Sequence, residues 1–457
     1  MMTPLYKAIL DYINKDMSRL HMPGHKGKNI YDINDLWKYD ITEIEGLDNL
    51  LDSQGVIKQT EERFSEVYGS KKSAILTQGS TLGVQMMLTA AYIASEKKSN
   101  KIIIDRNVHV SAINTIALLD LDPVWIFQDK INNKFMSGLI SAENIEKKIK
   151  ETPEAKIVYV TSPNYFGQIL DLKSIFKICQ KYDKFLLVDN AHGAHLKFIP
   201  GNFHPVDQGC SACCDSLHKT LPVLTGGGLL HVLDERLAPY IKKAQRLFSS
   251  TSPSYLTMVS IDLLLSYING GLRREYETLI YKVEALSQLA EDKGFDIPKG
   301  NIDPVKLVIG SGEYNCNGRE ISEALRKFKI EPEYVSKYWV LLMMSPQNRE
   351  IDFQRIEKAI KYMSDNFRKI KRERKENNNW SGVNLNSVNL KRGLSVKEAV
   401  LSESEIIETT QSEGRVVASS VVTCPPCVPI ITPGEIVSHE TIDILLESGI
   451  KFLEVTC

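Results

Sequence analysis

The chain has 457 residues, a length that corresponds to two or three domains of average size. Apolar residues make up 43% of it and charged residues 25%, which is the composition of a globular protein with a buried core. Because 56 Lys and Arg residues balance 57 Asp and Glu residues, we expect no nucleic-acid partner. No stretch approaches the roughly 18 consecutive apolar residues of a membrane span, so we expect no membrane partner.

The cysteine content and the first residues predict the compartment. Eight cysteines are too sparse for a disulfide scaffold, and the first twenty residues lack the continuous apolar stretch of a signal peptide. We therefore expect a cytoplasmic protein whose thiols are reduced.

Short apolar runs alternate with helical spacing between residues 73 and 230. Buried strands are expected at 74–76, 101–104, 157–160 and 185–188, and helices at 82–95, 140–151 and 172–182. This alternation predicts an α/β fold with a mostly parallel central sheet and helices on both faces. Ligands of such sheets bind beyond the carboxyl ends of the strands.

The rest of the chain predicts smaller units. Residues 255–291 have helical spacing with a break at Asn269-Gly270-Gly271, and a smaller α/β unit follows with strands at 305–308 and 339–344. The predicted organisation is an N-terminal arm (1–70), a large domain (71–295), a small α/β domain (296–370), a linker (371–394) and a C-terminal domain (395–457).

Polar motifs follow the predicted strands. Gly79, Ser80 and Thr81 open a helix whose amides and hydroxyls could hold a phosphate, although such a turn often only joins a strand to a helix. His109 follows the second strand and could stack on a flat cofactor, donate a proton or cap a helix. Asp189 ends a buried strand, where a carboxylate needs a partner.

Two further features compete as chemical sites. Asp189, His192 and His195 could bind a metal, but no further ligand cluster is evident and we expect none. Lys219 lies beside Ser216 and His218 and precedes an apolar, glycine-rich run that could desolvate its amine. A phosphate cup, a ring stacker, a carboxylate and a lysine are the parts that a pyridoxal phosphate (PLP) enzyme needs.

These residues resemble the Orn/Lys/Arg decarboxylase family of fold-type-I, aminotransferase-like PLP enzymes, in its compact form without an N-terminal wing domain. The stretches that carry the resemblance are His21 to Gly27, Gly46 to Asp48, Gly79 to Thr81, Asp105 to His109, Asp189 to His195, Ser216 to Lys219, Thr251 to Tyr255, Gly414-Arg415 and Pro433 to Glu435. The resemblance implies the PLP-transferase fold with smaller C-terminal α/β parts, and a PLP cofactor.

The resemblance also implies a role for each residue. Lys219 would be the Schiff-base lysine, Asp189 would pair with the pyridine nitrogen, and His109 would stack on the ring. Thr251 and Ser252 match a stretch that reaches the cofactor phosphate of a neighbouring subunit, which implies a homodimer or larger homo-oligomer with interfacial active sites. The other residues expected to contact the cofactor are Gly79, Ser80, Thr81, Ala191, His192, Ser216 and His218.

The implied reaction is PLP-dependent decarboxylation of arginine, lysine or ornithine to the amine and carbon dioxide, feeding polyamine biosynthesis. Transamination or elimination on another amino acid, a catalytically silent homologue and a zinc hydrolase stay open as alternatives.

Two departures from the family pattern concern substrate identity. Cys424-Pro425-Pro426-Cys427 stands where the family has an aromatic residue and a glycine, and the stretch from Asn49 to Gly55 is weaker than usual. A redox or zinc role for the two cysteines is less favoured than packing beside prolines. Candidate carboxylates for the substrate's distal charge are Asp48, Asp52 and Glu435.

Overall fold

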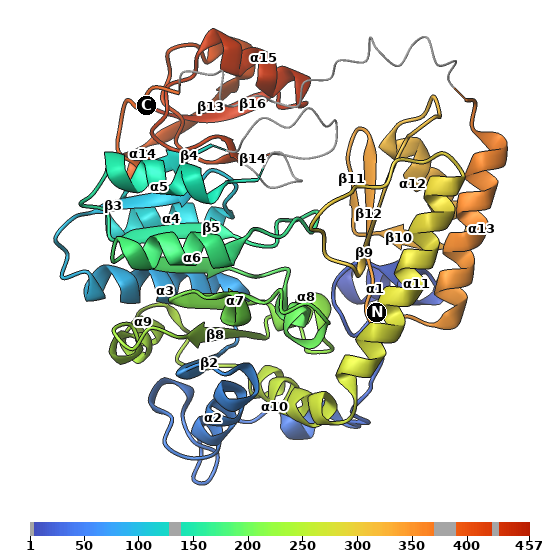
Figure 1. The fold of residues 1–457 in the computed structure, drawn as a ribbon, viewed down its shortest axis with the longest axis horizontal. Helices are drawn as coiled ribbons and strands as arrows, with labels where there is room; N and C mark the ends of the chain where they lie inside the picture. Colours follow the sequence, from blue (N-terminus) through green and yellow to red (C-terminus); the bar gives the residue numbers. More distant parts are fainter. Residues whose placement is uncertain (1–3, 128–138, 370–389, 423–428) are drawn as a thin grey trace.

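A seven-stranded sheet forms the centre of the molecule (Figure 1). The computed structural model describes residues 4–127, 139–369, 390–422 and 429–457. The strand order is β2-β8-β7-β6-β5-β3-β4. The strands are β2 (Lys72–Leu76), β3 (Lys101–Asp105), β4 (Asp122–Ile126), β5 (Ile157–Thr161), β6 (Phe185–Asp189), β7 (Ala212–Asp215) and β8 (Gly228–Val232).

Strand direction decides where the polar motifs meet. Strands β4, β3, β5, β6 and β7 are parallel, whereas β8 pairs antiparallel with both β7 and β2. Because β8 runs opposite to β7 and β2 runs opposite to β8, β2 runs in the same direction as the parallel strands. The carboxyl ends of β2, β3, β5, β6 and β7 therefore lie at one edge of the sheet, which confirms the mostly parallel sheet predicted from the sequence.

Helices cover both faces of this sheet, as predicted. The helices α3 (Gly79–Ala94), α4 (Val110–Leu119) and α9 (Ile241–Phe248) pack on one face, and α5 (Ala142–Glu151) and α6 (Leu172–Lys181) on the other. In β3, Ile102 and Ile104 join the first core while Ile103 joins the second, because successive side chains of a strand point to opposite faces. Every predicted strand and helix of this region is present.

Two long helices connect the large sheet to a smaller one. They are α10 (Tyr255–Asn269) and α11 (Leu272–Asp292), and Gly271 between them has a φ of +117°, which confirms the predicted break. The smaller sheet is antiparallel, in the order β11 (Tyr334–Val335), β12 (Trp339–Met343), β9 (Lys306–Gly310). Helices α12 (Gly318–Lys327) and α13 (Glu350–Asn366) belong to the same unit, and their apolar residues share a core with those of β9 and β12.

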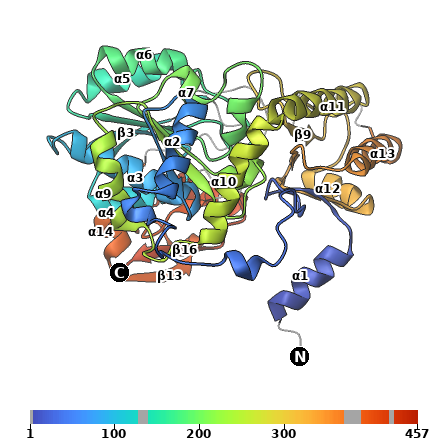
Figure 2. The same ribbon diagram turned by 90° about the horizontal axis from the view of Figure 1, so that it is seen from below.

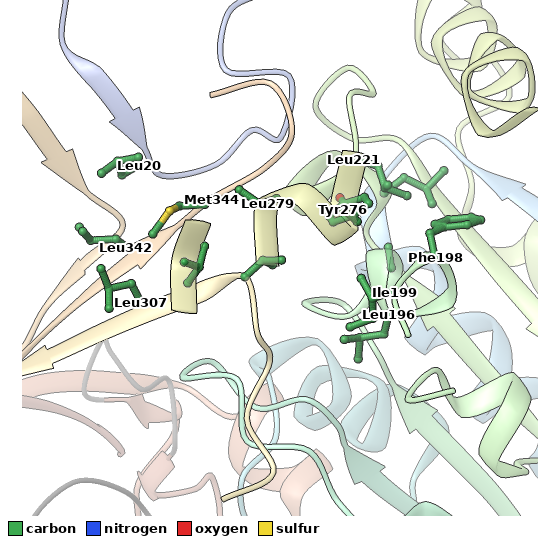
Figure 3. Packing of buried hydrophobic residues seen from close by; sticks show 14 of the residues in the cluster. Leu20, Leu196, Phe198, Ile199, Leu221, Tyr276, Leu279, Leu307, Leu342 and Met344 are labelled. Atoms are coloured by element: carbon green, nitrogen blue, oxygen red, sulfur yellow. The ribbon is translucent and has the colours of Figure 1, made fainter. Parts of the chain in front are cut away.

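The N-terminal residues pack onto both units. Strand β1 (Ser18–Leu20) pairs in parallel with β10 (Ile330–Pro332) of the smaller unit, while α1 (Pro4–Asn14) precedes it. One apolar cluster joins Leu20, Leu307 and Leu342 with Tyr276 of α11 and Leu196 of the large domain (Figure 3). The remaining described elements before residue 300 are α2 (Val56–Tyr68), α7 (Pro205–Gln208), α8 (Leu217–Thr220) and 3-10 turns at Leu36–Tyr39, Leu50–Asp52, Ala194–Phe198 and Ala238–Tyr240.

The C-terminal part packs beside α4 of the large domain through α14 (Val396–Leu401), whose Val396 joins the large-domain core (Figure 2). Its own core lies between α15 (His439–Glu447) and short strands. Those elements are β13 (Ser404–Glu408), the 3-10 turn Thr409–Gln411, β14 (Val421–Val422), β15 (Pro429–Ile431) and β16 (Phe452–Thr456). The predicted domain boundaries stay predictions, and most of the predicted linker lies outside the described residues.

A buried ion pair fastens the C-terminal part to the large sheet. Arg106, directly after β3, donates to both carboxylate oxygens of Glu435 at 2.7 Å. The same guanidinium donates to the hydroxyl of Thr432 and to the carbonyls of Pro429 and Ile430. All five N–H groups of the buried arginine are thus satisfied. In the described ranges, no helix is long and apolar enough to cross a bilayer.

Candidate active site

A cavity of about 320 Å³ lies at the sheet edge where the strands end. All the residues predicted to contact the cofactor line it except Thr251 and Ser252, which are exposed in the turn before α10. The lining residues are Gln78, Gly79, Ser80, Thr81, Asn107, Val108, His109, Thr161, Pro163, Tyr165, Asp189, Ala191, His192, Ser216, His218, Lys219, Thr225 and Gly226.

The N-terminus of α3 forms one end of the cavity. The Ser80 amide donates to Ser216 Oγ (3.1 Å), and the two serine hydroxyls are 2.9 Å apart. Gln78, which precedes the helix, makes no side-chain capping bond, and the Gly79 amide donates to the Gly226 carbonyl (2.6 Å). The positive end of the helix dipole and the Ser80 and Thr81 residues border the cavity here. A Cβ on Gly79 would lie 3.5 Å from His218 Cε1 and fill part of that space. This end has the donors and the room for a phosphate group.

Asp189 lies buried in the cavity wall at the end of β6. Its Oδ1 accepts the Ala191 amide (3.0 Å) and its Oδ2 accepts the Tyr159 hydroxyl (3.2 Å). Burial and the neighbouring Asp189 raise the pKa of Tyr159 well above its ordinary value, so the phenol stays a proton donor. Each carboxylate oxygen keeps a lone pair for a further donor, such as a protonated ring nitrogen.

Lys219 and His192 both line the cavity and are in contact with each other. The Lys219 Nζ lies 3.1 Å from His192 Nε2, and His192 packs edge-on against Tyr165 with ring centroids 4.8 Å apart. Burial, together with the charges of Lys219 and Lys306, holds the pKa of His192 well below its ordinary value. The imidazole is therefore neutral at physiological pH and can accept a hydrogen bond from the lysine. Its buried Nδ1 has no hydrogen-bond partner among the described residues.

His109 is the N-cap of α4. Its Nδ1 accepts the Ser111 amide at 3.2 Å, which fixes the orientation of the ring beside the cavity. Helix capping, one of the three roles considered from the sequence, is thus observed. The exposed ring also borders the cavity, as a stacking role requires.

His195 does not join Asp189 and His192 in a metal site. Its Nε2 lies 2.9 Å from Asp303 Oδ1 in a fully buried pair, whereas His192 contacts Lys219. Asp303 also lies 3.8 Å from the ammonium of Lys306, and Lys306 donates to the Tyr165 carbonyl at 3.2 Å. The three residues considered as zinc ligands therefore have separate partners.

The acidic residues considered for the substrate's distal charge lie elsewhere. Asp48 accepts the amides of Gln54 (3.0 Å) and Gly55 (2.7 Å), Asp52 pairs with Arg246 (3.2 Å), and Glu435 pairs with Arg106. None of the three lines the cavity. The altered stretch from Cys424 to Cys427 lies outside the described residues.

Three polar residues in or near the cavity, among others, were missed in the sequence. Tyr165 lines it, its hydroxyl donates to Glu333 Oε1 at 2.7 Å, and its carbonyl accepts from Lys306. The strand-end rule would have found Tyr165, which lies four residues after β5. Lys306 and Glu333 come from the smaller unit, and no local sequence pattern marks them.

Comparison with known proteins decides the family. Residues 3–297 match the major domain of Orn/Lys/Arg decarboxylases, and residues 382–453 match their C-terminal domain. The chain belongs to the Orn/Lys/Arg decarboxylase family. The family predicted from the sequence is confirmed, and with it an enzyme that decarboxylates basic amino acids.

Relatives within this family extend over nearly the whole chain. An arginine decarboxylase of Bacillus subtilis is 27% identical, over 98% of this chain and 93% of that protein. An uncharacterised protein of the same organism, YaaO, is 29% identical over 97% and 93%. The constitutive lysine decarboxylase of Escherichia coli is 23% identical over 64% of this chain and 45% of that protein.

Solved structures share the fold. The constitutive lysine decarboxylase of Escherichia coli superposes with a TM-score of 0.75 at 19% identity, covering 100% of this chain and 82% of that one. A structure of SPT with PLP superposes with a TM-score of 0.56 at 13% identity, covering 72% and 80%. The predicted PLP-transferase fold is confirmed.

Proposed function

We propose that this decarboxylase uses PLP bound in the cavity described above and that arginine is its substrate. The observation that carries the proposal is the fit of one cavity to the whole cofactor. It combines the polar end at Gly79, the buried carboxylate of Asp189 and the amine of Lys219. Arginine is favoured over lysine and ornithine because the relatives named arginine decarboxylase cover 98% of this chain.

Each cavity residue would have a separate task. Ser80, Thr81, Ser216 and His218 would hold the phosphate, and Lys219 would hold the aldehyde carbon. When bound, PLP supplies an electron sink that stabilises the carbanion left as carbon dioxide departs. Asp189 would keep a proton on the ring nitrogen, since its buried carboxylate makes hydrogen bonds on both oxygens and favours a cationic partner.

Proton transfer would involve His192 and Lys219. The neutral His192 Nε2 can accept a hydrogen bond from Lys219 Nζ at 3.1 Å, which would hold the lysine in position for proton transfer. Lys219, held in this way, would return a proton to the substrate carbon. His109 on the other side would hold the ring in place, so that the substrate bond to be broken keeps one orientation.

Glu333 is the carboxylate that we propose for the substrate's distal cation. It is half-buried and accepts hydrogen bonds from the Tyr165 hydroxyl and from the Met22 amide at 2.8 Å. Tyr165 borders the cavity, so a guanidinium that displaced or bridged its hydroxyl would reach the carboxylate. An arginine side chain would gain a charge-assisted hydrogen bond there.

We also propose a cytoplasmic homodimer whose amine product feeds polyamine synthesis. Residues 36–44 expose several apolar side chains, among them Trp37 with 85% of its surface accessible. Such a patch favours a protein partner. Thr251 and Ser252 are exposed, as residues that reach into a neighbouring subunit must be.

Carbon dioxide release is the direct test. The protein with added PLP should release it from carboxyl-labelled arginine, and Lys219→Ala should lose both this activity and the visible absorption of bound cofactor. Lys181→Ala removes an exposed lysine paired with Glu146 and should behave as wild type. Release of a keto acid instead, or no release from arginine, lysine or ornithine by the cofactor-loaded protein, would contradict the proposal.

Mixing variants tests the dimer. Lys219→Ala and a Thr251→Ala/Ser252→Ala double variant should each be inactive alone, and mixing them should restore activity if the residues serve the neighbouring subunit's site. An inactive mixture of subunits shown to exchange would contradict the shared site.

A further inference from the structure

A buried polar cluster lies at the end of β7, between the turn after Asp189 and the segment that carries Lys219. Its centre is Asp215, the last residue of β7, which is fully buried. One carboxylate oxygen accepts the side-chain amide of Asn190 at 2.7 Å. The other lies 3.0 Å from His204 Nε2 and 3.4 Å from His231 Nε2. None of these four residues lines the cavity.

Hydrogen bonding identifies the cluster as a buried carboxylate held by imidazole donors, and not as a metal site. Side-chain atoms of His204, Cys213 and Asp215 lie within 4.8 Å of one another, which would suit a metal ion. However, His204 Nδ1 accepts the Val206 amide at 3.2 Å and so carries no proton. The ring proton must then be on Nε2, which donates to Asp215 and has no lone pair for a metal.

The two imidazoles keep Asp215 ionised. Burial alone would raise the pKa of this carboxyl, but His204 and His231 outweigh burial and hold it below its ordinary value. Tyr68 stacks on His231 with ring centroids 3.9 Å apart, and Ser73 Oγ lies 2.9 Å from His231 Nδ1. The cluster is therefore fixed by packing as well as by charge.

Asp215 holds a turn that belongs to the cavity. Asn190 directly follows Asp189; its backbone amide donates to the Cys214 carbonyl (3.0 Å), and its backbone carbonyl accepts the Gly193 amide (2.8 Å). Ala191 and His192, which border the cavity, lie within this turn. A Cβ on Gly193 would lie 2.1 Å from Asn190 Oδ1, so the Asn190 side chain packs tightly under the turn.

The same residue also begins the segment that carries the lysine. Ser216 follows Asp215 directly, and Lys219 lies in the short helix α8 that comes next. Asp215 thus connects the turn that holds His192 with the segment that holds Lys219. These two side chains are 3.1 Å apart, the distance of a hydrogen bond, so the position of each depends on the segment that carries the other.

We propose that Asp215 is a positioning residue, which acts through Asn190 to fix His192 relative to Lys219. The inference rests on the proposed function. A displacement of reacting groups by about 1 Å costs on the order of a hundredfold in rate. Loss of the Asn190 link should therefore lower kcat by roughly tenfold to a hundredfold and leave KM less affected.

Asn190→Ala is the main test variant. It removes the link but leaves Asp215 with both histidines, so the buried charge stays paired and the fold should persist. Asp215→Asn, which also removes the charge, should lower kcat at least as much. Asn366→Ala removes an exposed asparagine that donates to the Tyr362 carbonyl at the end of α13, and serves as the control.

Two readouts separate positioning from general destabilisation. In cofactor-loaded Asn190→Ala, the pH midpoint of the visible absorption band should shift, because Lys219 loses its fixed contact with His192. In cofactor-free protein, the Gly193 amide should exchange hydrogen faster in Asn190→Ala than in wild type or Asn366→Ala.

The outcomes distinguish this inference from the proposed function. Unchanged amide exchange in the cofactor-free variant, or an unchanged kcat and band midpoint in the loaded one, would overturn the role of Asp215. So would a stoichiometric metal ion found in the purified wild-type protein. If the Gly193 amide exchanges faster in Asn190→Ala but the wild-type protein releases no carbon dioxide, the link through Asn190 is supported and only the proposed reaction is rejected.

Discussion

Replacing Glu435 by Gln should strongly destabilise the attachment of the C-terminal part. The pair with Arg106 is buried, with 2% and 4% of the two side chains exposed, and both carboxylate oxygens lie 2.7 Å from the guanidinium. Gln keeps the shape but leaves a buried arginine without a counter-charge. Removing one partner of such a pair costs about 3–5 kcal/mol, because the remaining charge stays desolvated.

Urea unfolding followed by tryptophan fluorescence measures this effect. Trp125 is a built-in reporter, since its ring lies 4.8 Å from the Arg106 guanidinium carbon. The control is Asp120→Asn, which breaks an exposed pair with Lys397 (3.4 Å) between the same two parts of the chain. Exposed pairs contribute at most about 1 kcal/mol, so this variant should unfold almost as wild type does.

An apolar replacement of both partners sharpens the test. The double variant Arg106→Met/Glu435→Leu should recover much of the lost stability, because a well-packed apolar pair often replaces a buried ion pair at little cost. A Glu435→Gln protein within about 1 kcal/mol of wild type would refute the reasoning, since the charge would then have little role in the attachment.

Three further predictions concern residues close to the cavity that do not line it. Gly193→Ala places a Cβ 2.1 Å from Asn190 Oδ1 and should weaken PLP binding, measured by fluorescence titration; unchanged binding would contradict the tight turn. Glu333→Gln should raise KM for arginine by roughly tenfold to a hundredfold with little change in kcat, and an unchanged KM would exclude Glu333 as the distal contact. Lys306 has a pKa of about 8 because it is buried, against 10.5 ordinarily, so the unfolded chain binds more protons between these pH values and stability should rise with pH there. The rise should approach about 3 kcal/mol in urea unfolding at pH 8 to 10.5 and should disappear in Lys306→Met; an identical rise in both proteins would refute this assignment.

The sequence predicts the strands that are apolar throughout and misses those that are not. Strand β7 ends in Cys214-Asp215, and β8 lies inside a run of glycines and leucines, so neither shows a separate apolar run. Strand β4 contains Pro123, which a strand tolerates at the edge of a sheet, where β4 lies. Missing these strands did not affect the predicted fold, because the alternation before them had already indicated a parallel sheet.

The residues of the candidate site also divide into those that the sequence predicts and those that it misses. Gly79, Asp189 and Lys219 could be found because each lies at the end of a strand or within a few residues after it, and the carboxyl ends of those strands share one edge. Lys306 and Glu333 reach the same place from the smaller unit, more than eighty residues later in the chain. Only the packing of the two units brings them there, and no local pattern encodes it.

The contacts of Asp303 and Lys306 also restrict how a substrate enters. A swing of the smaller unit away from the large sheet would separate Asp303 from His195 and Lys306 from the Tyr165 carbonyl. Breaking such buried charged contacts costs several kcal/mol, so opening the two units is an unfavourable route for each turnover. The substrate should therefore enter, and the product leave, through the exposed rim of the cavity near His109 and Thr225.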